Sequence, residues 1–136
     1  MNIKFLVKSF VNSKNQRCNL DIHKNEETVF SRQYVEPGIL DLDLGPICKD
    51  TLIEFIITGK KGSYTLKDSD TAFKIEKLII GDYDYYTKIN LFSNYFTEKG
   101  VLRTNGYMGF DGRYVFKFRY PLSKHLLMCD YKQQKY

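Results

Sequence analysis

The sequence predicts an all-β protein, an antiparallel β-sandwich or jelly roll formed by a single domain. Short alternating runs recur at intervals of roughly 8 to 12 residues with turn-forming residues between them, as in many sandwiches. Eleven tyrosines and ten phenylalanines, with no tryptophan, favour strands because large flat side chains suit a half-buried pleated surface. A length of 136 residues is enough for one core and one domain.

Three strands are expected in the first quarter of the chain. Residues 3–7 alternate between apolar and polar side chains, which predicts a strand at the N-terminus. After a turn-rich break at residues 12–16, the same alternation at residues 18–22 predicts a second strand that forms a hairpin with the first. A third strand is expected at residues 28–33, before the turn set by Pro37-Gly38.

The middle of the chain contains the clearest strand signals. In "ILDLDL", at residues 39–44, the leucines share one face while Asp41 and Asp43 share the other, which predicts a strand with one wet face. The run "TLIEFIITGK", at residues 51–60, is dense in β-branched and aromatic residues. It predicts a central strand that is buried on both faces.

A loop with a short strand at residues 64–66 is expected next, because glycine, serine and aspartate dominate that region. The following run "FKIEKLII" predicts a strand with one irregularity, since its apolar residues shift phase between Ile75 and Leu78. Residues 93–106 lack periodicity and predict a long loop, a type of segment that often carries function.

The stretch "GYMGFDGRYVFKFRYP" predicts a hairpin near the C-terminus. We expect "GFDG" to form its tight turn, with Gly112 at positive φ, and "RYVFKFRYP" to form the returning strand. Period-two alternation directs Tyr114, Phe116 and Phe118 to the core and the basic residues outward. The segment after Pro121, "LSKHLLMC", fits either a final strand or a short helix.

The charge pattern argues against a nucleic-acid partner. The formal net charge is +5, but the 21 lysines and arginines are scattered among 16 acids without a long basic block. A single-strand-binding platform needs aromatic and basic side chains on one face, whereas the aromatic strand places them on opposite faces. The glycines of "GYMGFDG" also lack the strand-to-helix context of a phosphate loop.

The cysteines and the hydropathy pattern predict a soluble, unexported protein with no membrane partner. Cys18, Cys48 and Cys129 are odd in number and far apart, with no CxxC pair, so we expect reduced and mostly buried thiols. No apolar stretch approaches the ~18 residues of a membrane span. The N-terminal segment "MNIKFLVKSF" is too short and too interrupted for a secretory signal.

No catalytic constellation is evident, and we expect a protein that is not an enzyme. The only histidines are His23 and His125, and surface or satisfied core roles are expected for both. Cys129 follows His125 at a spacing of four, but no nucleophile-type turn surrounds it.

Three pairs of aspartates are candidates for acid chemistry or metal binding, although solvated positions are expected for all of them: Asp41 with Asp43, Asp68 with Asp70, and Asp82 with Asp84. The last two pairs flank one predicted strand. If they converged, their oxygens would suit Ca²⁺. Because solvated positions are expected for these aspartates, no cofactor is predicted. The alternative is calcium held by Asp68, Asp70, Asp82 and Asp84.

The order of motifs over residues 50–127 resembles small β-sandwich proteins of tailed-bacteriophage particles, which have the look of carbohydrate-binding-module jelly rolls. The positions that match the family pattern are Gly59-Lys60, Asp70-Thr71, Gly106, Gly109, Asp111-Gly112, Phe118 and Pro121. Asp111 stands where the family more often has Asn, and no Trp follows Pro121.

The resemblance implies a non-enzymatic virion structural protein, acting as a capsid decoration, neck, tail or baseplate component and assembled in the host cytoplasm. Its partners would be other virion proteins in a homo- or hetero-oligomeric assembly. Aromatic residues that pack against a neighbour are typical anchors of such contacts. The candidate contact residues, each with a core role as the alternative, are Tyr83, Tyr85, Tyr86, Phe92, Tyr95 and Phe96.

Two other classes of function stay open from the sequence. A carbohydrate-binding module would stack exposed tyrosines on sugar rings and would use the aspartates for calcium. A hydrolase would need two carboxylates that converge in a cleft.

Overall fold

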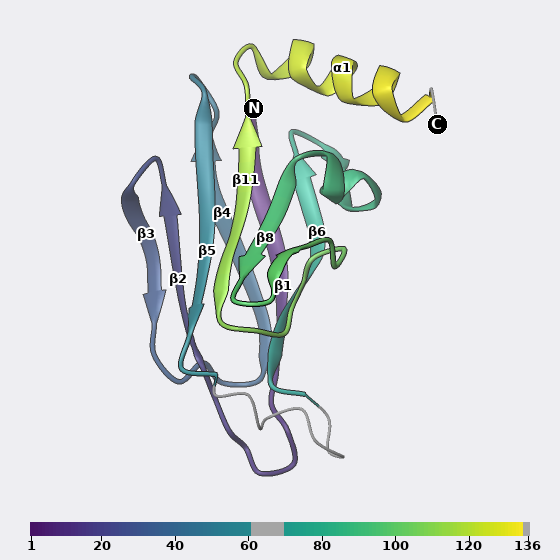
Figure 1. Cartoon of the computed structure of the whole chain (residues 1–136). Coiled ribbons are helices and arrows are strands. Elements are labelled where there is room, and N and C mark those ends of the chain that lie inside the picture. The colour runs from purple at the N-terminus through teal and green to yellow at the C-terminus, as the bar shows by residue number, and fades with distance from the viewer. Residues whose placement is uncertain (61–69, 135–136) are drawn as a thin grey trace.

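The computed structural model describes residues 1–60 and 70–134, with side chains described as far as Met128. Two antiparallel sheets pack face to face, and a helix lies across one end of them (Figure 1). The predicted all-β sandwich is therefore confirmed. The short strand expected at residues 64–66 and the candidate ligand Asp68 lie outside the described residues.

The sheets are named A and B here. Sheet A has the order β10 (Tyr107–Met108), β6 (Ala72–Ile80), β1 (Asn2–Phe10) and β4 (Gly38–Pro46), and β7 (Tyr83–Asp84) also pairs with β6. Sheet B has the order β3 (Glu27–Arg32), β2 (Asn19–Lys24), β5 (Thr51–Thr58), β11 (Gly112–Phe118), β8 (Ser93–Thr97) and β9 (Gly100–Leu102). Most connections carry the chain from one sheet to the other, as in a jelly roll.

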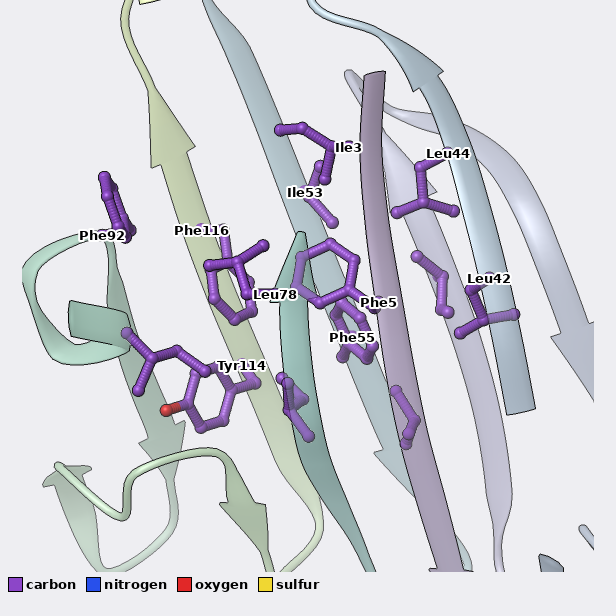
Figure 2. Packing of buried hydrophobic residues seen from close by; sticks show 14 of the residues in the cluster. Ile3, Phe5, Leu42, Leu44, Ile53, Phe55, Leu78, Phe92, Tyr114 and Phe116 are labelled. Carbon is purple, nitrogen blue, oxygen red and sulfur yellow. The ribbon is translucent and has the colours of Figure 1, made fainter. Parts of the chain in front are cut away.

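The aromatic residues of β11 face the core, as their alternation predicts. Phe116 is fully buried, and its ring lies 5.0 Å from that of Phe5 on β1 and 5.8 Å from that of Phe55 on β5. Figure 2 shows these three rings together between the sheets. Because β1 belongs to sheet A while β5 and β11 belong to sheet B, this cluster joins the two layers.

The irregularity expected in β6 is a β-bulge. Leu6 of β1 lies opposite Lys77, whereas Val7 lies opposite Ile75, so Glu76 is the extra residue on β6. The extra residue allows both Ile75 and Leu78 to face the core, where each is fully buried.

Both predicted hairpins are wrong. β1 pairs with β4 and β6 in sheet A, whereas β2 pairs with β3 and β5 in sheet B. Likewise β10 pairs with β6 in sheet A, whereas β11 pairs with β5 and β8 in sheet B. The "GFDG" segment therefore crosses between the sheets, because alternation marks a strand without specifying its partner.

The long loop expected at residues 93–106 is also wrong, because this segment contains β8 and β9, which form a hairpin at the edge of sheet B. Its alternation is hidden because apolar Phe96 and Val101 lie on the exposed face of the hairpin. β5 is central in sheet B, as predicted, but its outer face is only partly buried, since Glu54 is buried there while Leu52 and Ile56 are partly exposed.

The C-terminal segment is a helix, which settles the alternatives left open by the sequence. In α1 (Leu122–Gln134), Leu122 and Leu126 are one turn apart and pack against the core, while Leu127 and Met128 are exposed. The short 3-10 helix η1 (Tyr86–Leu91) covers the neighbouring end of β6. Within the described residues, no helix is both long and apolar enough to span a bilayer.

Gly112 has a positive φ of 159°, as expected, but it is the first residue of β11 and does not form the tight turn that was expected. A Cβ atom at this position would nevertheless lie only 2.2 Å from the carbonyl oxygen of Phe96 on β8. Gly112→Val is therefore expected to lower the free energy of unfolding by about 1 to 3 kcal/mol, as overpacking usually does. Urea titration measures this change. Lys117→Val, at an exposed position of the same strand, is the control, and equal stability of the two variants would contradict the close approach.

Candidate interaction surface

Four of the six predicted contact residues reach the surface. Tyr83 on β7 is 72% exposed, Phe96 on β8 is 38% exposed, and Tyr85 and Tyr86 are partly buried. The Tyr86 hydroxyl donates a hydrogen bond of 2.8 Å to the carbonyl oxygen of Asn105, which fixes this ring beside the β9–β10 connection.

The prediction is wrong for Phe92 and Tyr95, which belong to the core. Phe92 is only 4% exposed, and its ring lies 5.3 Å from that of Phe118. Tyr95 is fully buried and stacks on Tyr114, and its hydroxyl oxygen accepts a hydrogen bond from the Phe110 N–H at 2.9 Å. Burial raises the pKa of Tyr95. These two aromatic residues fill the sandwich, so they belong to the core rather than to an exposed contact surface.

An apolar pair is exposed on the outer side of the edge hairpin. Phe96 lies directly opposite Val101 of β9, which is 58% exposed. On the other side, Phe96 lies opposite Arg113 of β11, whose guanidinium carbon is 5.9 Å from the centre of the Phe96 ring. The hairpin thus presents two adjoining apolar side chains with a cation beside them.

Basic residues surround a hollow next to this pair. The hollow, of about 290 Å³, is enclosed by η1, β8, the end of β11 and α1. Among the described residues, its lining includes three cations, Arg103, Lys117 and Arg119, and no carboxylate. We call the surface that combines the hollow with the apolar pair the β8–α1 face; its residues are Leu91, Asn94, Phe96, Val101, Arg103, Lys117, Arg119 and Met128.

His125 links the wall of the hollow to the strand beneath it. The Nδ1 atom of His125 accepts a hydrogen bond of 3.0 Å from the backbone N–H of Arg119. Its ring lies edge to face against Phe92, with 5.7 Å between the ring centres. His125 is thus partly buried and hydrogen-bonded, and the sequence predicts a surface or satisfied core role for it.

A larger hollow, of about 590 Å³, lies on the outer face of sheet A, but its charges are balanced. It is lined by Lys4, Phe5, Leu6, Asp41, Asp43, Lys77 and Ile79. Lys4 and Asp43 lie opposite each other on neighbouring strands, so opposite charges adjoin. Asp41 and Asp43 are exposed on this wet face, as predicted.

Several residues that match the family pattern meet at a buried polar cluster, here called the Lys60 cluster. The Lys60 side chain is 2% exposed, and its Nζ lies 2.5 Å from Asp70 Oδ1. The Tyr107 hydroxyl donates a hydrogen bond to Asp70 Oδ2, and the Lys60 backbone N–H donates one of 2.8 Å to Asp111 Oδ1. Burial, followed by the hydrogen bond to Asp70, raises the pKa of Tyr107.

The cluster continues into the connection between β1 and β2. The Thr71 hydroxyl donates to the carbonyl oxygen of Gln16 at 2.8 Å and accepts from the Asn12 N–H at 3.2 Å. Burial raises the pKa of the nearby Cys18 thiol to about 11, against a smaller opposing effect of the Lys60 charge. Together these contacts hold the segments that cross between the sheets, so this group is structural.

The thiols differ from the expectation in one case. Cys18 is buried, as expected, but Cys48 is exposed, and the side chain of Cys129 lies outside the described part.

The calcium hypothesis is wrong in its geometry. Asp70 precedes β6, whereas Asp82 and Asp84 follow it, and nine extended residues span about 30 Å. Asp70 is held by Lys60 and Tyr107, and Asp84 Oδ1 accepts hydrogen bonds from two backbone N–H groups. Within residues 1–60 and 70–128, no group of three His, Cys, Asp or Glu side chains is placed to hold a metal ion.

No protein-family model matches the chain, and no curated protein or solved structure matches it either. The structure itself defines the class, an antiparallel β-sandwich with a C-terminal helix. On the β8–α1 face, exposed apolar residues adjoin cations that form no ion pair with the described residues.

Proposed function

We propose that this chain is a non-enzymatic structural protein of a bacteriophage particle, which assembles with other virion proteins through the β8–α1 face. The observation that carries the proposal is the exposed pair of Phe96 and Val101 on the edge hairpin. Apolar side chains on an exposed sheet edge favour association, and monomeric proteins usually protect such edges.

The backbone of the same hairpin supports a docking role. β9 is the last strand of sheet B and pairs with β8 alone in the described structure. Its other edge offers N–H and C=O groups to a strand from a neighbour, a mode of binding known as β-augmentation. Val101 lies at the middle of β9 and would be covered by such a strand.

The particle is inferred from the family resemblance of residues 50–127. The Lys60 cluster adds a physical reason for the matching pattern, since Lys60, Asp70 and Asp111 together hold the crossing segments. At a head-decoration, neck, tail or baseplate position, the sandwich would serve as a structural subunit that contacts its neighbours. The protein would reach its place during assembly in the host cytoplasm.

We do not propose glycan binding. A sugar-binding platform needs exposed aromatic rings beside a hollow, and no tyrosine of the described residues lines either hollow described above. Tyr83, the most exposed of the predicted contact residues, lies on β7 of sheet A.

The proposal is tested by supplying tagged variants to a phage that lacks its own copy of this gene. Val101→Asp is expected to reduce the number of copies per purified particle about ten-fold or more, since a carboxylate would be buried in an apolar contact. The matched control is Val29→Asp on β3, an exposed valine at the opposite edge of sheet B.

Both variants are first compared with the wild type by thermal unfolding. Normal incorporation of Val101→Asp, or an equal loss for both variants, would count against the β8–α1 face.

A further inference from the structure

The geometry points to a partner of defined chemistry for the hollow of the β8–α1 face. We infer that it receives an acidic, amphipathic segment of a neighbouring protein, whose carboxylates pair with Arg103, Lys117 and Arg119. This inference rests on the proposed assembly role, because it names the kind of segment that the neighbour presents.

Within the described part of the chain, the three cations form no ion pair. Three cations among the described residues form ion pairs, which join Arg17 to Glu36, Lys60 to Asp70 and Arg113 to Glu54. In contrast, no ion pair to Arg103, Lys117 or Arg119 occurs among the described residues. Clustered like charges repel one another and attract an anionic partner, which favours a counter-charge from outside the chain.

One carboxylate lies close to the hollow but is already engaged. Asp50 lines an adjoining groove of about 250 Å³, which shares Lys117 and Arg119 with the hollow. Its Oδ1 accepts a hydrogen bond of 2.7 Å from the backbone N–H of Tyr120. The Asp50 side chain is thus held by the backbone at the end of β11, and its carboxylate lies in the adjoining groove rather than in the hollow.

The apolar part of the lining favours a peptide over other polyanions. Leu91 and Met128 are 40% and 47% exposed, and both line the hollow beside the cations. Phe92, the only aromatic residue besides His125 among the described lining residues, is 4% exposed, so it offers no face for stacking. Single-stranded nucleic acids and sugars depend on such stacking. A segment with carboxylates next to a leucine or methionine would satisfy both kinds of lining residue.

The hollow is built on fixed elements, which lowers the entropy lost on binding. Lys117 belongs to β11 and lies opposite Leu52 of β5. Its backbone N–H donates a hydrogen bond of 2.9 Å to the carbonyl oxygen of Phe92. Arg119 is tied through its N–H to His125 of α1. The backbone that carries these two cations is therefore held before a partner arrives.

The test measures binding of a labelled acidic peptide by fluorescence anisotropy. The probe is a fluorescein-labelled peptide of repeating Glu-Glu-Leu, and its control has Gln in place of every Glu. We expect binding of the Glu peptide that weakens when the salt rises from about 20 mM to about 200 mM, because salt screens exposed charges. The double variant Arg103→Gln/Lys117→Gln is expected to bind the Glu peptide with an affinity at least about ten-fold lower than that of the wild type.

The matched control removes the same charge from the other sheet. Lys4→Gln/Lys77→Gln alters two exposed cations on the outer face of sheet A and should bind within about two-fold of the wild type. Thermal unfolding checks that both double variants are folded. Equal weakening by both, or equal binding of the Gln peptide, would overturn the inference, because the effect would then reflect net charge or apolar contact alone.

Two further probes separate this site from other anion sites. Oligo-deoxythymidine or inorganic phosphate that binds through Arg103 and Lys117 more tightly than the Glu peptide would also overturn the inference. If the Glu peptide does not bind but Val101→Asp is still excluded from particles, the inference about an acidic segment is wrong and the proposed assembly role stands. If the protein binds the Glu peptide but is absent from particles, the proposed function is wrong instead.

Discussion

Phe116→Ala is expected to lower the free energy of unfolding by about 3 to 5 kcal/mol, the usual effect of truncating a buried aromatic residue. Phe116 is fully buried, and its ring contacts Phe5 and Phe55 across the core (Figure 2). It also stacks between Tyr114 and Phe118 along β11, with ring centres 5.2 and 6.2 Å away. Removal of this ring leaves a cavity where the two sheets meet.

Urea titration of the purified protein measures this loss. Lys117→Ala, at the next position of β11, is the control and should change stability by less than about 0.5 kcal/mol. A loss below about 1 kcal/mol for Phe116→Ala, typical of surface positions, would show that the aromatic face is not the core. It would also revive a stacking platform for nucleic acid as the role of this strand.

Asp70→Ala is expected to have a similar effect, a loss of about 3 to 5 kcal/mol, because it leaves a buried charge without its partner. The Lys60 side chain is 2% exposed, so water cannot replace the carboxylate easily. The Tyr107 hydroxyl would lose its hydrogen-bond acceptor in the same substitution. The segments that cross between the sheets would then be held less firmly.

The double variant Lys60→Met/Asp70→Leu separates charge from packing. Because it removes both charges, it should be clearly more stable than Asp70→Ala. Asp82→Ala, which removes an exposed acid beyond the other end of β6, is the control and should be nearly neutral. Equal stability of Asp70→Ala and Asp82→Ala in urea titration would contradict a structural role for the Lys60 cluster.

Strand faces could be predicted from the sequence because burial acts on each residue through local alternation. Leu42 and Leu44 are buried, Asp41 and Asp43 are exposed, and β11 directs its aromatic residues inward. Even the bulge at Glu76 leaves a trace, as a phase shift between apolar positions.

Strand partners could not be predicted, because pairing depends on contacts between residues that are far apart in the chain. The assignment of β1 and β2 to different sheets has no local signal. The hairpin of β8 and β9 was hidden for a different reason. Its exposed face carries Phe96 and Val101, so polarity does not alternate along it.

The candidate surface was predictable only in part. Lys117 and Arg119 are two residues apart, so alternation places them on one side of β11 and its extension. Arg103 joins them only through the pairing of β9 with β8, and Met128 only through the docking of α1. Phe92 and Tyr95 were candidate contact residues with a core role as the alternative, and both are buried in the core.

The most direct test of the proposed assembly role is quantitative mass spectrometry of purified particles of the proposed source phage. The account predicts a fixed number of copies of the chain for each copy of a major structural protein, unchanged through repeated purification. A chain that is made during infection but is absent from the particles, or present in variable trace amounts, would contradict it.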